Sequence, residues 1–323
     1  MNSLKRIGID TYMILLFVMV LAGALIPARG VAADALHQVS YWAVTLLFFL
    51  YGAKLDAGSV KAGFLNWRLQ GLTFTATFIL FPLLGLAMAA LFGPVLGPEM
   101  ATGLLFLSIL PSTVQSSIAF TSIAGGNVPA AICAASVSNM IGVVLTPLLA
   151  ALVLHQDGGG ISADAVIKIG EQIVLPFIVG QLLRRWIGGF VAKHKFLTML
   201  VDRGAILLIV YSAFSSGTVA GLWTQVPALS LVALLVVVWI FLGLAFAIMA
   251  RGGKLLGLPG EDRIVLLFCG STKSLASGLP IASALFPAAA VGAIILPTML
   301  FHLSQLLLCS MLAQRWARAR AAA

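Results

Sequence analysis

The sequence predicts an all-α polytopic membrane protein of about ten transmembrane helices, built as two inverted halves. Three observations predict this fold: an apolar composition, ten hydrophobic runs of membrane length, and short matches between the two halves. The 323 residues are 61% hydrophobic and 9% charged, with a mean hydropathy of +1.11. Ordinary soluble domains carry roughly 25% charged residues. So few charges could not cover a soluble surface of this size, and we expect lipid to cover most of it.

Ten apolar runs are long enough to cross a bilayer as α-helices, which takes about 20 residues each. We expect the first run to be retained as a helix rather than removed as a signal peptide, because it is long and the repeat requires it as a partner. The runs leave no room for a sizeable soluble domain. The expected spans are 11–28, 39–55, 69–93, 101–123, 128–154, 166–186, 203–221, 226–250, 264–285 and 287–314.

The distribution of basic residues predicts the orientation. With the N-terminus inside, sixteen of the nineteen basic residues fall on the inner side, Arg29 and Lys168 fall outside, and Lys273 lies within a span. An excess of Lys and Arg is typical of cytoplasmic loops. The net charge of +9 is explained in this way, and we expect no nucleic-acid partner. The prediction is an N-in/C-in protein of a bacterial-type cytoplasmic (inner) membrane, with the lipid bilayer as its surroundings.

Short sequence matches recur at a nearly constant distance of 158–161 positions, about half the chain length. Such self-similarity is typical of internal repeats. Five spans per half is an odd number, so the second half (158–323) should be inverted relative to the first (1–157), across a Gly-rich link at 155–160. Two like halves that exchange conformations give alternating access, which indicates a secondary transporter. The matching pairs are Asp10 with Glu171, 50–53 with 210–213, 84–87 with 242–245, and 111–113 with 270–272.

Two expected spans, the fourth and the ninth, differ from the others and are repeat partners. Residues 110–117 read LPSTVQSS, and residues 269–280 read CGSTKSLASGLP. Each places Pro or Gly beside dense hydroxyl groups at mid-membrane depth, which predicts a broken helix. Broken helices at corresponding positions of two halves indicate a binding site, and their ends supply partial charges for ions or anions. The alternative is that these Ser and Thr residues only hold helices together.

Polar residues on and near the two segments are the candidate substrate- or ion-binding residues. Ser136 and Asn139 share one face of the fifth span, because they are three positions apart. His302, in the tenth span, could relay protons or could be a packing histidine. The candidates are Thr77, Ser112, Thr113, Gln115, Ser116, Ser117, Ser136, Asn139, Ser271, Thr272, Lys273 and Ser274.

Lys273 is the most informative single candidate. A cation at mid-membrane costs about 2.5–3.5 kcal/mol on insertion scales, and such residues usually serve function. Lys273 could be a fixed cation in a place where another transporter binds a metal ion, or a proton carrier. A third interpretation is a lysine with a structural contact in a water-filled vestibule.

These segments resemble the sodium/bile-acid symporter family, and most closely its bile-acid-cotransporter-7-like branch, which includes bacterial members. The resemblance runs essentially from end to end. It implies a panel domain of spans 1, 2, 6 and 7, and a core domain of spans 3, 4, 5, 8, 9 and 10. It also implies a substrate site near the crossing of broken spans 4 and 9. The resembling segments are 268–275 with 278–280, 125–127 leading to 145–149, and 175–181 with 184–185.

The chain departs from the sodium-dependent members of that family at positions that the resemblance assigns to sodium binding. Their ninth-span glutamate falls at Ser271, their third-span glutamine at Thr77, and their fourth-span Ser-Asn pair at 116–117. The missing carboxylate, together with Lys273, argues against ordinary two-sodium coupling. A sodium ion near Ser116, Ser117 and Ser271, or H+ as the coupling ion, stays open. Bile-acid transport is not implied.

We therefore expect a secondary transporter of a small organic or anionic solute, without an enzymatic activity or a bound cofactor. Ser271 and Lys273 do not suggest a catalytic dyad, because side chains at i and i+2 diverge on a helix. The three cysteines lie in apolar runs without a CxxC or Cys/His cluster, so no zinc site is indicated. The alternative function is a regulatory or scaffold membrane protein that keeps the fold without transport.

Overall fold

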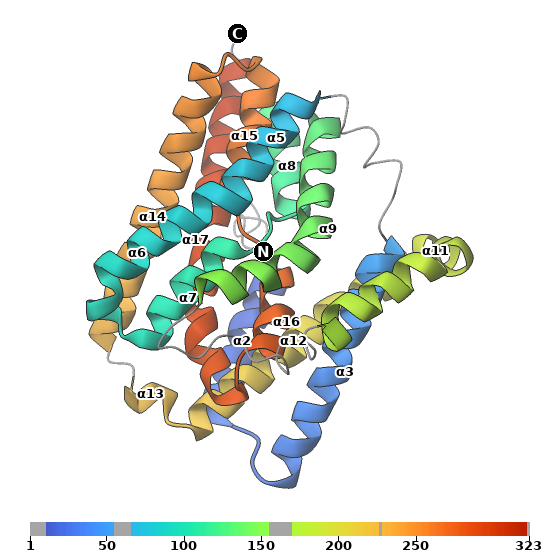
Figure 1. Ribbon diagram of the computed structural model, residues 1–323, viewed down its shortest axis with the longest axis vertical. Helices are drawn as coiled ribbons and strands as arrows, with labels where there is room; N and C mark the ends of the chain where they lie inside the picture. Colours follow the sequence, from blue (N-terminus) through green and yellow to red (C-terminus); the bar gives the residue numbers. More distant parts are fainter. Residues whose placement is uncertain (1–10, 55–65, 155–169, 226–227, 322–323) are drawn as a thin grey trace.

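The computed structural model describes residues 11–54, 66–154, 170–225 and 228–321, and the regular structure in these ranges is entirely helical (Figure 1). Asp10, the link at 155–160, the boundary between the halves and Lys168 lie outside the described residues. The elements are α2 (Thr11–Leu25), α3 (Val31–Lys54), α5 (Trp67–Thr75), η2 (Ala76–Leu80), α6 (Phe81–Leu96), α7 (Pro98–Ile109), α8 (Gln115–Ala124), α9 (Val128–Val153), η3 (Gly170–Val174), α11 (Leu175–Lys193), α12 (Lys195–Val219), α13 (Leu222–Gln225), α14 (Ala228–Leu255), α15 (Gly260–Ser271), α16 (Leu275–Leu285) and α17 (Ala288–Ala321).

The chain is a polytopic helical membrane protein. In the described ranges, seven helical segments are long and apolar enough to cross a membrane, and Ile14–Leu25 and Pro98–Ile109 are shorter apolar helices. Helices lie in the described part of each of the ten ranges expected as spans; the expected fourth span is divided between α7 and α8, and the ninth between α15 and α16.

Large apolar side chains are exposed along several of the helices. Leu91 of α6 and Leu182 of α11 are both 66% exposed, and Leu152 of α9 is 73% exposed. Exposed large apolar side chains in such number are unusual on soluble monomers. They fit a surface that faces hydrocarbon.

Glycines bring α3 and α11 into close contact, and these helices run side by side in Figure 1. A Cβ atom on Gly52 would collide with the carbonyl oxygen of Phe177, and one on Gly180 would collide with that of Phe49. In the same way, Gly23 of α2 packs directly against Phe214 of α12. Small residues at such crossings let helix backbones approach closely in membranes.

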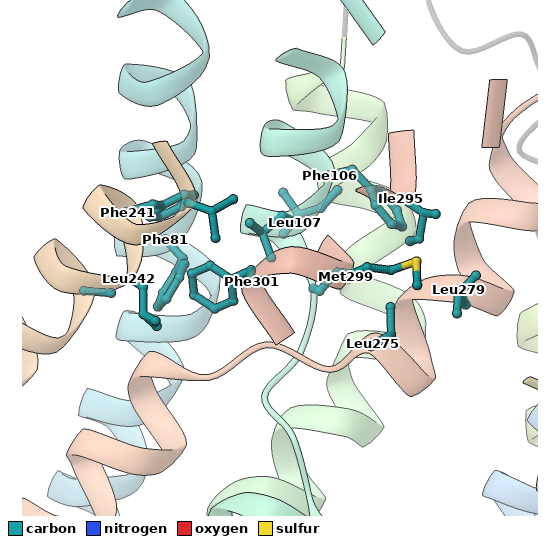
Figure 2. Close-up of a cluster of buried hydrophobic side chains, with 14 of the residues drawn as sticks. Phe81, Phe106, Leu107, Phe241, Leu242, Leu275, Leu279, Ile295, Met299 and Phe301 are labelled. Carbon is teal, nitrogen blue, oxygen red and sulfur yellow. The ribbon is translucent and has the colours of Figure 1, made fainter. Parts of the chain in front are cut away.

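An aromatic cluster joins α6, α14 and α17 (Figure 2). The ring centroids of Phe81, Phe241 and Phe301 are 5.4 to 6.2 Å apart, and all three side chains are fully buried. Tilted and edge-to-face pairs at these distances stabilise a core beyond the burial of apolar area. The cluster holds three long helices together beside the broken segments.

Asp262, in the first turn of α15, joins the N-termini of three helices. The side chains of Asn66 and Asn127 cap α5 and α9 by accepting hydrogen bonds from Leu69 N and Ala130 N. The amide groups of both asparagines donate to the Asp262 carboxylate, each at 2.9 Å. A carboxylate near helix N-termini is electrostatically favourable. This junction fixes α5, α9 and α15 relative to one another.

A π-helical turn, η2, interrupts the helix that runs from Trp67 to Leu96. The N–H of Phe81 bonds to the carbonyl of Ala76, five residues earlier, instead of four. Such π-turns insert an extra residue and often occur at functional sites. Here the turn places the carbonyl of Thr77 beside the broken segments.

Candidate functional site

Both predicted helix breaks are present, and the two extended segments meet inside the protein. The first separates α7 from α8, with Leu110 extended at φ −71° and ψ 152°. The second separates α15 from α16, with Thr272 extended at φ −105° and ψ 151°. The N–H of Ser274 donates to the carbonyl of Pro111 at 2.8 Å. The two interruptions therefore satisfy part of each other's backbone hydrogen-bonding requirement.

Helix α9 supplies partners for the backbone of the first break. Ser138 Oγ accepts from Ser112 N at 3.0 Å, and Asn139 Nδ2 donates to Ser112 O at 2.7 Å. Thr146 Oγ1 donates to the carbonyl of Ile109 at 3.0 Å. Unpaired backbone N–H and C=O groups cost free energy at membrane depth. The hydrogen bonds from these three side chains offset that cost and so stabilise the break.

Five hydroxyl groups form a cluster where the breaks meet. Thr272 Oγ1 lies 3.0 Å from Thr113 Oγ1, 2.9 Å from Ser117 Oγ and 3.2 Å from Ser112 Oγ. Ser116 Oγ donates to Thr113 Oγ1 at 2.8 Å. Because hydroxyls both donate and accept, these groups form a continuous hydrogen-bond network. The network connects the buried crossing to Ser116, the partly exposed member of the cluster.

Gln305 of α17 satisfies the backbone of the second break. Its Oε1 accepts from Lys273 N at 2.8 Å, and its Nε2 donates to Lys273 O at 2.9 Å. The same Nε2 lies 2.8 Å from His302 Nδ1. One buried amide thus replaces both hydrogen bonds that Lys273 would make in a continuous helix.

A cavity of about 1530 Å³ leads to the crossing from one end of the protein. Its walls come from α2, α3, α11 and α12 on one side and from α8, α9 and α16 on the other. Among the described residues, five basic residues and one acidic residue line it. They are Lys54, Arg184, Arg185, Lys195 and Arg203, with Asp202, which forms an ion pair with Lys54.

A second pocket, of about 370 Å³, lies along the same interface. The described residues that line it include Tyr41 of α3, Gln172 of η3, Ser212 of α12 and Ser283 of α16. The large cavity is lined by later residues of α3 and earlier residues of α12 and α16. The two hollows therefore lie toward opposite ends of the same helices.

Six of the candidate residues line the large cavity, and six do not. Gln115 is exposed there, and Ser274 caps α16 by accepting from Ser277 N. Ser271 is buried, and its hydroxyl has no hydrogen-bond partner among the described residues. The lining residues are Thr113, Gln115, Ser116, Ser136, Asn139 and Ser274. The others are Thr77, Ser112, Ser117, Ser271, Thr272 and Lys273.

Two further placements refine the expectations. The hydroxyl of Thr77 donates to the carbonyl of Thr73 within its own helix, so Thr77 contributes its main-chain oxygen to Lys273 instead. Ser116 and Ser117 belong to the hydroxyl cluster, whereas no hydrogen bond joins Ser271 to it in the described part of the chain.

Sequence reasoning missed Gln305 and the basic lining of the cavity. A glutamine in the middle of the apolar run 287–314 was a usable signal, because polar side chains inside spans usually bond across helices. The basic residues were assigned to topology alone, and only the packing of α3, α11 and α12 shows that they surround one cavity.

Comparison with known proteins agrees with this architecture. The chain is 49% identical over 312 residues to "Uncharacterized protein PA2026" of Pseudomonas aeruginosa, which covers 96% of this chain and 94% of that protein. It is 42% identical to "Putative symporter YfeH" of Escherichia coli, over 96% of this chain and 93% of the relative. It is 26% identical to "Sodium/bile acid cotransporter 7" of Danio rerio, over 97% and 95%. The model of the SBF-like CPA transporter family matches residues 10–318, and the protein belongs to that family of membrane transporters.

Proposed function

We propose that this protein is a secondary active transporter that moves a small organic anion across the membrane by alternating access. The observation that carries the proposal is the large cavity, which has a basic lining and ends at two broken helices. Relatives named as a symporter and a sodium/bile acid cotransporter support transport as the activity.

The electrostatics of the cavity favour an anion. The described lining residues include five basic side chains and one acidic side chain, and clefts lined by one sign of charge concentrate ligands of the other sign. The N-terminus of α8 also faces the cavity through Gln115 and Ser116, and Val114 before it provides no side-chain cap. Uncapped N–H groups at a helix N-terminus attract negative charge. We assign the anionic group of the substrate to this end.

The remaining cavity surface suits an apolar body. Leu16, Phe48, Phe177 and Ile206 also line the cavity. Ligand sites commonly combine apolar walls with a few placed polar groups. A compact organic anion would use both.

The two hollows support alternating access. They lie toward opposite ends of α3, α12 and α16, so a tilt of one helix group against the other would close the large cavity and enlarge the small one. We assign α2, α3, α11 and α12 to a panel domain and the remaining long helices to a core domain. The large cavity would then face the inner side.

The packing supports a ten-span inverted repeat with halves 1–157 and 158–323. The pairs α2 with α12 and α3 with α11 are spans 1 with 7 and 2 with 6. In a five-plus-five repeat, span 1 corresponds to span 6 and span 2 corresponds to span 7. Exchanging the halves therefore converts the contact of spans 1 and 7 into the contact of spans 6 and 2, as a pseudo-twofold axis requires. N-in/C-in topology in a cytoplasmic membrane completes this proposal.

For substrate binding we propose the cavity-lining residues Gln115, Ser116, Ser136, Asn139 and Ser274, with Thr113 behind them. The candidates that do not line the cavity would act on the site through the hydroxyl cluster and the backbone of the two breaks.

Flux into proteoliposomes tests the proposal. Purified protein should accelerate uptake of one or more carboxylate or sulfate solutes, and not of matched neutral or cationic analogues. Sodium and proton gradients, imposed separately, would identify the coupling ion. Folded protein that moves no solute across a broad anion panel would contradict transport and would favour a regulatory or scaffold role. Selective uptake of cations would contradict the anion assignment alone.

A further inference from the structure

The ammonium group of Lys273 is enclosed by main-chain oxygens. Its Nζ donates to the carbonyl oxygens of Thr77 at 2.8 Å, Ser108 at 2.7 Å and Leu110 at 2.7 Å. The side chain is 0% exposed, and it lines neither of the two hollows. We name these three oxygens the carbonyl cage. Lys273 is thus neither in a vestibule nor in contact with the proposed substrate.

The carbonyl cage selects the charged form of the lysine. An ammonium group has three N–H donors, one for each oxygen, whereas a neutral amine has two donors and a lone pair that would face the third oxygen. The three distances are those of charge-assisted hydrogen bonds. Nζ also lies 4.2 Å from the centroid of the Phe81 ring, and such a ring face attracts cations.

The position of the carbonyl cage in the fold supplies the negative potential that a buried cation needs. Ser108 and Leu110 lie at the C-terminal end of α7, where carbonyls lack helical partners and carry partial negative charge. Thr77 lies in the π-turn η2. Phe81 belongs to the aromatic cluster shown in Figure 2, which closes one side of the cage. Three elements converge on one cation.

We propose that the carbonyl cage is a monovalent-cation site that the chain fills permanently with its own ammonium group. Lys273 is then a tethered cation that fastens the second break to the end of α7 and to η2. An occupied site takes no Na+ from solution at this position, and an ammonium group whose three N–H groups all donate hydrogen bonds does not release a proton during the cycle. The role of Lys273 in transport rests on the proposed function; occupancy of the carbonyl cage does not.

Chemical rescue of stability tests this site without any transport assay. Lys273→Ala removes three carbons and the nitrogen, which n-propylammonium replaces atom for atom. Removing one partner from a buried charged site should lower Tm by roughly 10 °C. We expect n-propylammonium chloride to restore several degrees, whereas equal concentrations of propan-1-ol or choline chloride restore none. The wild-type protein should respond to none of the three.

One further variant and one folding measurement exclude trivial explanations. Lys273→Met fills the space with an apolar chain, so it should be destabilised and should not be rescued. If Lys273→Ala does not fold without the amine, its recovery as folded protein only in the presence of n-propylammonium is the expected result. The proposal is overturned if Lys273→Met is as stable as wild type, if propan-1-ol rescues as well as the amine, or if amine never increases folded Lys273→Ala. A sodium-dependent rise in wild-type Tm that Lys273→Ala abolishes would also overturn it.

Discussion

The hydroxyl groups of Thr113 and Thr272 lie 3.0 Å apart although the residues are 159 positions apart in the chain. That distance in sequence is also the offset between the matching segments 111–113 and 270–272. Residues related by a twofold axis can bond to each other only if both lie close to that axis. The pair therefore marks where the proposed pseudo-twofold axis passes through the hydroxyl cluster.

The first prediction concerns this pair. Thr113→Val and Thr272→Val keep the side-chain shape and remove one hydroxyl each. Since the two hydroxyls share partners, a double-mutant cycle of unfolding free energies should give a coupling of about 1–2 kcal/mol. The measurement is thermal or denaturant unfolding in detergent. Thr298→Val is the matched control, because the buried hydroxyl of Thr298 has no partner among the described residues and its loss should be nearly neutral. A coupling near zero would contradict the cluster.

The second prediction concerns the amide of Gln305. Gln305→Met preserves side-chain length but leaves the N–H of Lys273 unpaired in a buried site, and the C=O of Lys273 keeps only the 3.5 Å contact with His302 Nδ1. Each unpaired group costs about 1–3 kcal/mol, so the variant should lose several degrees of Tm. Gln314→Met, on the same helix, should have a smaller effect, because Gln314 is only partly buried and donates a hydrogen bond to the side chain of Ser310. Equal stabilities of the two variants would refute the role given to Gln305.

The third prediction concerns the junction at Asp262. Asp262→Ala removes the acceptor that both Asn66 and Asn127 use, so α5, α9 and α15 should separate more easily. We expect a loss of about 2–4 kcal/mol in the free energy of unfolding. Faster hydrogen exchange in the first turns of the three helices would locate the effect. The neighbouring variant Glu261→Ala alters an exposed side chain and should leave exchange unchanged.

The fourth prediction concerns the basic lining of the cavity. Arg185→Glu with Lys195→Glu reverses two exposed charges at the cavity wall. For an anionic substrate we expect KM to rise by about tenfold, which is about 1.4 kcal/mol, with a larger rise at low salt. Arg251→Glu, which reverses an exposed charge outside both hollows, should leave KM unchanged. A lower KM in the double variant would point to a cationic substrate.

The fifth prediction concerns the close contact of α3 with α11. Gly180→Ala forces its Cβ atom against the carbonyl of Phe49, so the helices must move apart and the protein should be destabilised by about 1–3 kcal/mol. Gly189→Ala on the same helix meets open space and should be neutral or slightly stabilising. Melting temperatures of the two variants in detergent make the comparison.

The helices and their breaks were predictable because apolar run length and Pro or Gly beside hydroxyl groups are local signals. All ten predicted ranges coincide with helical segments, and both predicted interruptions occur. Within the part of the chain that the structure describes, seven segments qualify as spans on length and composition, so the count of ten stays part of the proposal. The prominence of Lys273 was also predictable, because a cation inside an apolar run is costly wherever the chain folds.

The partners of these residues were not predictable, because they depend on contacts between distant segments. Nothing near Lys273 in the sequence indicates that its ammonium group meets Thr77 and Leu110, or that Gln305 pairs with its backbone. The cavity could not be predicted either, because Arg185 and Lys195 come together with Lys54 only through helix packing. Asp262 gave no signal, since an acidic first turn is ordinary in a helix.

The π-turn η2 makes the carbonyl cage depend on chain length as well as on residue identity. Deleting Phe78 or Ile79 would restore a regular α-helix, and every residue before the deletion would rotate by about 100° relative to α6. Asn66 would then leave Asp262, and the oxygen of Thr77 would turn away from Lys273. A single-codon loss that removes no charged or catalytic group would thus undo two distant contacts at once.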